Sequence, residues 1–130
     1  MILLALAAAT AAQPALDCDN AYTQSDMNQC AWIEYEAADA ALNAQWAETA
    51  AAMKRMDAGA DTTYDDGRPG YFDQLLAAQR VWLKYRDEHC ASEGYLARGG
   101  SMEPLLVSTC KTDLTEKRTK ELRELTEWGN

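Results

Sequence analysis

Four cysteines set the first limits on the chemistry of this 130-residue sequence: Cys18, Cys30, Cys90 and Cys110. Structural zinc sites use closely spaced cysteine pairs together with further cysteines or histidines. No Cys-x-x-Cys pair occurs here, and His89 is the only histidine. An even number of cysteines in a short exported domain is typical of disulfides. We therefore predict two disulfides and no metal site.

Groups for acid–base or nucleophilic catalysis are poorly placed. His89 would need a serine or a free thiol beside it, and the adjacent Cys90 points elsewhere on a helix. Carboxylates such as Glu34, Glu36 and Asp39 would cleave glycosides only across a cleft, which a slim helical protein of this size hardly offers. No glycine-rich phosphate loop or calcium loop occurs. We predict that the protein is not an enzyme and uses no cofactor.

Polar residues interrupt the apolar helical pattern at four positions: Glu34, Gln79, Arg86 and Arg118. Glu34 lies one turn after a cysteine and Arg86 one turn before another, so antiparallel helices would bring the two to one level. Buried charges are tolerated only when they are paired and hydrogen-bonded. We predict a buried polar network in which Glu34 pairs with Arg86, near Arg118, and Gln79 is a hydrogen-bonded core amide. A catalytic or ligand-binding cluster is the alternative.

The elements that must hold these residues are helices. Alanine is abundant and the strand formers Val, Ile and Phe are scarce. Apolar residues recur at helical spacing over 25–56, 71–96 and 113–128. Gly, Asp and Pro predict a loop over 57–70, and residues 98–101 end the second helix before a short turn. We predict an all-α fold, a small antiparallel bundle of three main helices around one core.

This arrangement brings the cysteines together. Cys30 falls near the start of the first helix, Cys90 near the end of the second, and Cys110 just before the third. In an antiparallel bundle these positions share one end, and Cys18 can fold back to join them. Four cysteines allow three pairings. We favour Cys18–Cys30 and Cys90–Cys110, which tie each incoming segment to a helix.

The N-terminal residues differ from the rest. Residues 2–12 are apolar or small and uncharged, and they are too few to span a bilayer, which needs about 20 apolar residues. They fit a secretory signal peptide over 1–12 without the usual preceding cation, and a frayed alanine-rich helix is the alternative. We expect one domain over 13–130 that is periplasmic or secreted. A lipid-anchored form is less favoured because Asp17, not a small residue, precedes Cys18.

The net charge of −9 limits the choice of partner. Such acidity argues against binding to nucleic acid or to an anionic lipid surface. It is compatible with a basic protein partner, because complementary charge speeds encounter. Charge that serves only solubility is the alternative, and the oligomeric state stays open.

A pattern across nearly the whole chain carries a family resemblance. It comprises Cys18, Met27-Asn28-Gln29-Cys30, Asp39, Leu42-Asn43, Gln79-Arg80-x-Trp82-x-x-Tyr85-Arg86-x-x-x-Cys90, Gly99-Gly100-Ser101, Cys110 and Leu114-Thr115-x-x-Arg118-Thr119-x-x-Leu122. The pattern resembles the LprI-type lysozyme-inhibitor family of bacterial envelope domains. The resemblance implies an exported helical domain that binds and blocks a lysozyme. The alternative is a periplasmic interaction or assembly module without lysozyme activity.

One loop suits the function that the resemblance implies. Arg98, Gly99, Gly100 and Ser101 combine a cation with small, flexible residues at a bend that should protrude. The cleft of a lysozyme carries two carboxylates, which a cation would complement. This loop is a candidate partner-binding loop. A simple glycine turn between helices is the interpretation that we favour from the sequence.

Overall fold

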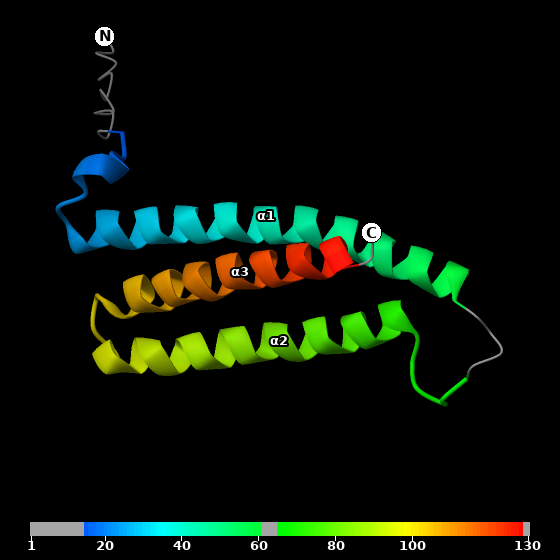
Figure 1. Ribbon diagram of the computed structural model, residues 1–130. Helices are drawn as coiled ribbons and strands as arrows, with labels where there is room; N and C mark the ends of the chain where they lie inside the picture. The colour runs from blue at the N-terminus through cyan, green and yellow to red at the C-terminus, as the bar shows by residue number, and fades with distance from the viewer. Residues whose placement is uncertain (1–14, 61–64, 129–130) are drawn as a thin grey trace, which may run out of the picture.

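The computed structural model describes residues 15–60 and 65–128, and these residues form an antiparallel bundle of three helices (Figure 1). The helices are α1 (Gln24–Gly59), α2 (Tyr71–Gly94) and α3 (Glu103–Trp128). Two short 3-10 turns accompany them, η1 (Cys18–Asn20) before α1 and η2 (Tyr95–Ala97) after α2. The predicted all-α fold is confirmed. The predicted signal peptide over 1–12 lies outside the described residues.

Local hydrogen bonds fix where the first two helices begin. The Thr23 hydroxyl accepts a hydrogen bond from the Asp26 N–H at 3.0 Å, which caps the start of α1. The cap of α2 comes from a distant residue, because Gly70 offers no side chain there. Asp57, near the end of α1, accepts from the Tyr71 and Phe72 N–H groups at 2.7 and 3.1 Å. One carboxylate therefore links the end of α1 to the start of α2.

The third helix begins earlier than predicted. The apolar pattern predicts a short turn and then a helix from residue 113. In the structure α3 starts at Glu103 and continues without a break through Cys110. Pro104 lies in the first turn, where backbone N–H groups have no intrahelical acceptor, so a residue without an N–H is tolerated. The second helix ends at Gly94, and η2 replaces its predicted last turn. A Cβ at Gly94 would lie 2.5 Å from Val107, so this glycine permits the close approach of α2 and α3.

The apolar core contains few large side chains. Leu42, Met53, Leu75 and Leu122 form its buried centre, and Trp46, Met56, Phe72 and Trp82 pack against them. Leu42 and Leu122 are the most completely buried of the large side chains. The core joins all three helices and excludes water from the middle of the bundle.

Hydroxyl side chains fill much of the interface between α1 and α3, which is the most extensive helix contact in the bundle. We call this set the hydroxyl seam: Thr49, Ser108, Thr112, Thr115, Thr119 and Thr126. Thr49 Oγ1 lies 2.8 Å from the Leu122 carbonyl oxygen and 2.7 Å from Thr126 Oγ1. Within α3, the Thr112 and Thr119 hydroxyls donate to carbonyls one turn back. These bonds satisfy the hydroxyls of Thr49, Thr112 and Thr119 inside the bundle.

Both predicted disulfides are present. Cys18 bonds to Cys30 with a Cα–Cα distance of 5.6 Å, and Cys90 bonds to Cys110 at 5.4 Å. All four cysteines lie at the end of the bundle that holds the start of α1 and the connection from α2 to α3 (Figure 1). We call this the stapled end. Within the described ranges, no helix combines the length and apolar character needed to cross a membrane.

Candidate functional site

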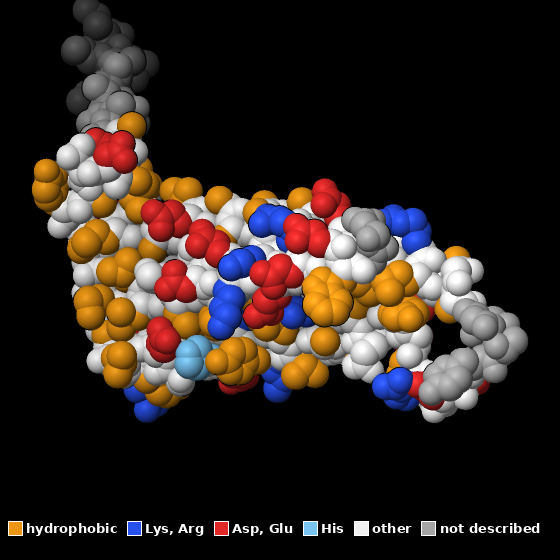
Figure 2. Space-filling view, viewed as in Figure 1, with side chains coloured by type: hydrophobic (Ala, Val, Ile, Leu, Met, Phe, Trp, Pro, Cys, Tyr) orange, Lys and Arg blue, Asp and Glu red, His pale blue; other side chains and the backbone are white. Residues whose placement is uncertain are grey.

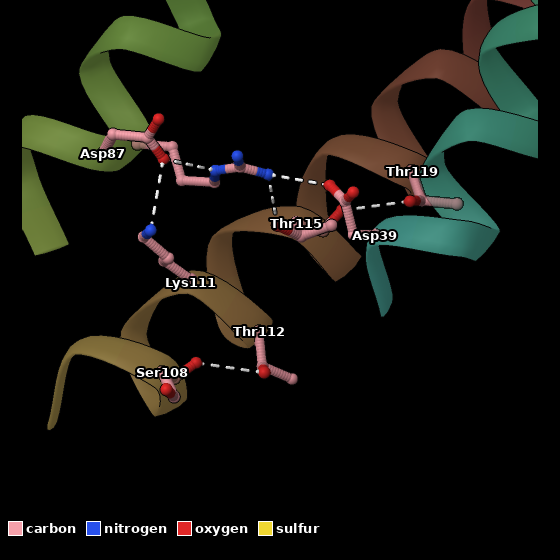
Figure 3. Close-up of polar contacts among 8 residues, drawn as sticks. Asp39, Asp87, Ser108, Lys111, Thr112, Thr115 and Thr119 are labelled. Atoms are coloured by element: carbon pink, nitrogen blue, oxygen red, sulfur yellow. Dashed lines mark hydrogen bonds and ion pairs between the residues drawn. The ribbon is translucent and has the colours of Figure 1, made fainter. Parts of the chain in front are cut away.

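Arg86 is a charged residue inside the bundle, with a side chain only 6% exposed. Its Nη1 donates to Asp39 Oδ1 of α1 at 3.1 Å and to Thr115 Oγ1 of α3 at 3.2 Å, and its Nε donates to Asp87 Oδ1 at 3.0 Å (Figure 3). Lys111 reaches the same Asp87 oxygen at 3.7 Å. The guanidinium thus connects all three helices. Its partners supply the compensation that a buried charge requires.

Aromatic rings cover the remaining faces of Arg86. The guanidinium carbon lies 5.3 Å from the ring centres of both Tyr35 and Trp82, within cation–π range. Burial opposes the charge on Arg86, but its hydrogen bond to Asp87, the nearby Tyr35 and its bond to Asp39 together raise its pKa. Burial also raises the pKa of the Tyr35 hydroxyl, and the neighbouring Arg86 opposes that rise. Arg86 therefore stays charged and Tyr35 stays neutral over the physiological pH range.

A second arginine extends the network. The Arg118 Nε donates to the Gln79 side-chain oxygen at 2.9 Å, and its Nη1 pairs with Glu121 at 3.0 Å. Its guanidinium lies 6.0 Å from the Trp82 ring, on which Arg86 also rests. Gln79 is buried and hydrogen-bonded, as expected of a core amide. Two of the four predicted network residues, Arg86 and Arg118, therefore lie over one tryptophan, and Gln79 is bonded to Arg118.

The predicted pairing of Glu34 with Arg86 is wrong. Glu34 is exposed, and Asp39 occupies the place assigned to it. The buried side of α1 runs through Ala31, Tyr35 and Ala38. Glu34 directly precedes Tyr35 and so is turned about 100° away from it. Asp39 lies one turn beyond Tyr35, which is the sequence signal that identifies it as the partner.

The chemistry open to this network is structural. Each arginine is engaged by carboxylates or an amide, and every fully buried side-chain polar atom in the described part of the chain has a hydrogen-bond partner. Among the described residues, His89, Glu93 and Cys110 come close enough to suggest a metal site. Cys110 is already bonded to Cys90, so its sulfur offers no thiolate. His89 pairs with Glu93 at 3.1 Å on the surface.

The loop 98–101 joins η2 to α3 at the stapled end, and all four of its residues are exposed. Gly99 has a φ of 76°, a left-handed conformation that glycine adopts without strain. Its N–H donates to Glu103 Oε2 at 3.1 Å, and the Gly100 N–H donates to the Ala97 carbonyl at 2.8 Å. Asn28 of α1 donates to the Ser101 carbonyl at 2.8 Å. The loop is therefore held in one shape from both sides.

Exposed apolar side chains surround this loop, a feature that sequence patterns do not reveal. Arg98 rests over the Tyr95 ring at 4.6 Å. The exposed large hydrophobics in this region are Tyr22, Trp32, Ile33, Tyr95, Leu96 and Met102. Figure 2 shows hydrophobic side chains gathered along this end of the molecule. The stapled end therefore combines a shaped loop, a cation and apolar surface, which are the components of a protein-binding site.

These features define a class of protein: a small all-helical domain that is stapled at one end by two disulfides and holds a buried arginine, Arg86, between its three helices. The sequence profile described as "Lysozyme inhibitor LprI" matches residues 17–122, and the chain belongs to this family. An uncharacterized protein of Rhizobium meliloti (strain 1021) is 46% identical over 127 residues, which cover 98% of this chain and 91% of the relative. No solved structure matches the chain significantly. The resemblance found in the sequence is confirmed.

Proposed function

We propose that this protein is exported and that it binds and blocks a lysozyme through the loop 98–101. Family membership over residues 17–122 is the observation that carries the proposal, because the family is described as lysozyme inhibitors. The geometry of the loop supports it. The Glu103 carboxylate, the Ala97 carbonyl and the Asn28 side chain hold the loop in shape before any partner arrives, so little conformational entropy is lost on binding.

Arg98 is the residue of the loop that would engage the lysozyme cleft. Its guanidinium is exposed and stacks on Tyr95. The cleft of a lysozyme carries two catalytic carboxylates, with which a guanidinium forms strong, directional hydrogen bonds. The neighbouring glycines present backbone without side-chain bulk, which allows the loop to enter a narrow cleft. Ser101 adds a hydroxyl at the base of the loop.

Two observations support export without a lipid anchor. Disulfides persist in oxidising compartments outside the cytosol, and this chain uses all four of its cysteines in two of them. The sulfur of Cys18 is bonded to Cys30 and is therefore not free to carry a lipid. The apolar residues 1–12 would serve as the signal peptide. The destination is the periplasm or the exterior of the cell.

The test is inhibition of a c-type lysozyme by the oxidised protein, followed as lysis of cell-wall suspensions at low and at moderate salt. We expect dose-dependent inhibition that survives moderate salt, because a seated loop depends less on screened charge than a loose encounter does. Inhibition that disappears with salt would indicate charge attraction alone. Absence of inhibition across lysozyme classes would favour the envelope interaction module.

The loop is tested by Arg98→Ala and Ser101→Ala. We expect Arg98→Ala to weaken inhibition about tenfold or more, since it removes a central charged anchor. Arg55→Ala is the matched control, because Arg55 is also exposed but lies at the far end of α1. Unchanged inhibition by both loop variants would remove the loop from the binding surface.

A further inference from the structure

An open apolar groove lies beside the loop at the stapled end. It has a volume of about 380 Å³ and is lined by Asn28, Gln29, Trp32, Ile33, Pro104 and Ser108. The start of α1 forms one wall and the start of α3 forms the other. Trp32 is 47% exposed and Ile33 is 49% exposed, so half of each large side chain remains in water. We call this the α1–α3 groove.

The groove and the loop form one continuous surface. Asn28 lines the groove, and its side-chain amide donates to the Ser101 carbonyl of the loop at 2.8 Å. Pro104 lines the groove three residues after the loop ends. A partner that contacts the loop would therefore meet the groove within the same interface. The Cys18–Cys30 bridge fixes the chain just before this part of α1.

The charge around the groove selects the kind of partner. From residue 15 to residue 53 the chain has no lysine or arginine. The acidic residues of that stretch are Asp17, Asp19, Asp26, Glu34, Glu36, Asp39 and Glu48. Glu36 lies one turn beyond Trp32 and Ile33, and Asp26 lies one turn before Gln29, so carboxylates flank the groove along α1. The α1 side of this apolar groove therefore complements an apolar side chain that is surrounded by lysines or arginines.

We propose that the α1–α3 groove receives an apolar side chain from a cationic protein surface, and that Trp32 and Ile33 are the main anchors of this contact. The inference rests on the proposed function and extends it: the partner is a basic lysozyme, held by the groove while the loop occupies its cleft. Tryptophan is enriched among the residues that dominate protein interfaces, because it contributes a large apolar area at a small entropic cost. In this proposal the loop occupies the lysozyme cleft and inhibits the enzyme, and the groove contributes much of the binding affinity.

The first test measures the affinity of the oxidised protein for a basic c-type lysozyme by titration calorimetry. We expect Trp32→Ala to weaken binding by at least about tenfold. Trp128→Ala is the matched control, because Trp128 is 90% exposed at the opposite end of α3, and it should bind like the wild type. Circular dichroism and thermal unfolding of each variant would verify the fold, since Trp32 also packs 5.2 Å from the Tyr35 ring.

A second pair of variants separates apolar contact from charge. Ile33 is 49% exposed and lies outside the buried core of the described residues, so Ile33→Glu and Ile33→Lys should both fold. If the groove seats an apolar side chain of a cationic surface, both variants weaken binding, and the lysine variant weakens it more. Equal binding by both variants and by the wild type would overturn the proposal.

The outcomes distinguish the groove from the proposed function. Inhibition that is lost in Arg98→Ala but unchanged in Trp32→Ala and both Ile33 variants would keep the lysozyme inhibitor and overturn the groove. Weaker binding in the groove variants with unchanged Trp128→Ala would support it. A wild-type protein that neither binds nor inhibits any lysozyme would overturn both.

Discussion

Arg86 brings a full positive charge into a core that has few large apolar side chains. Its carboxylate partners come from α1 and α2, its hydroxyl partner comes from α3, and two aromatic rings cover its faces. Removing an exposed charge changes the free energy of unfolding little. Removing a buried charge such as that of Arg86 is more destabilising, because its partners lose the opposite charge that compensated them. This side chain therefore links the three helices at one level of the bundle.

Arg86→Ala should lower the free energy of unfolding by about 2–4 kcal/mol, because it leaves a cavity between two rings and removes the cation paired with Asp39 and one of the two cations near Asp87. Glu34→Gln is the control and should change stability by less than about 0.5 kcal/mol, since Glu34 is exposed. Urea denaturation followed by circular dichroism gives both values. A large effect of Glu34→Gln with a small effect of Arg86→Ala would contradict the observed pairing.

Tyr35 should make the protein sensitive to alkali. Its pKa is raised above the ordinary value of 10.0, chiefly by burial. The unfolded chain therefore ionises this hydroxyl at a lower pH than the folded chain does. The resulting stabilisation is fully present below about pH 10 and is lost as the pH rises through the folded-state pKa.

The measurement compares wild type with Tyr35→Phe in denaturation experiments at about pH 8 and about pH 11. The free energy of unfolding should fall more steeply with pH in the wild type than in the variant. Tyr22→Phe is the control, because Tyr22 is 85% exposed. Parallel pH profiles for wild type and Tyr35→Phe would show that this hydroxyl does not contribute.

At the level of helices, a side chain near the end of α1 caps the start of α2. Asp57 of α1 accepts hydrogen bonds from two N–H groups at the start of α2, where the helix dipole also favours a negative charge. Gly70, the residue in the cap position, has no side chain to do this. The start of α2 is therefore capped by a residue that lies fourteen positions before Tyr71 in the sequence.

Asp57→Ala should destabilise the protein by about 1 kcal/mol, the usual cost of losing an N-terminal cap. Asp57→Asn keeps one acceptor oxygen and should lose about half as much. Glu48→Ala, at an exposed position of the same helix, serves as the control. Thermal unfolding would rank the three variants, and an equal loss in Glu48→Ala would argue against the cap.

The sequence predicts α1 and α2 well because their buried faces carry apolar residues at helical spacing. It misses the first turns of α3 because the buried residues there include Ser108 and Thr112, which do not register as apolar. The choice between Glu34 and Asp39 depends on the rotational phase of α1, and one residue changes that phase by about 100°. The α1–α3 groove is not predictable locally, because the exposure of Trp32 depends on how far α3 extends beside it.

For the molecule as a whole, the two disulfides differ in access. Cys90 and Cys110 are 0% and 5% exposed and join α2 to α3 within the bundle. Cys18 is exposed, although its partner Cys30 is only 7% exposed, and this bridge ties the segment before α1 to the helix. Reduction requires a thiolate to reach a sulfur atom, so access controls its rate in the folded protein.

Mild reduction of the native protein should therefore open Cys18–Cys30 first. Alkylation followed by peptide mass mapping should find label on Cys18 and Cys30 while Cys90–Cys110 stays intact. The denatured protein is the control, in which both bridges should be reduced at similar rates. Faster labelling of Cys90 and Cys110 in the native protein would show that α2 and α3 separate before the N-terminal segment does.

The hydroxyl seam has a consequence for how stability responds to temperature. Threonines such as Thr49, Thr115 and Thr119 are buried where many bundles place leucines. Unfolding therefore exposes more polar and less apolar surface than usual, and polar exposure lowers the heat capacity of the unfolded state. Calorimetry should give a heat-capacity increment below about 12 cal/mol/K per residue. A larger increment would contradict this account. A smaller increment flattens the dependence of the free energy of unfolding on temperature. The stability of the protein would then change little between cold and warm surroundings.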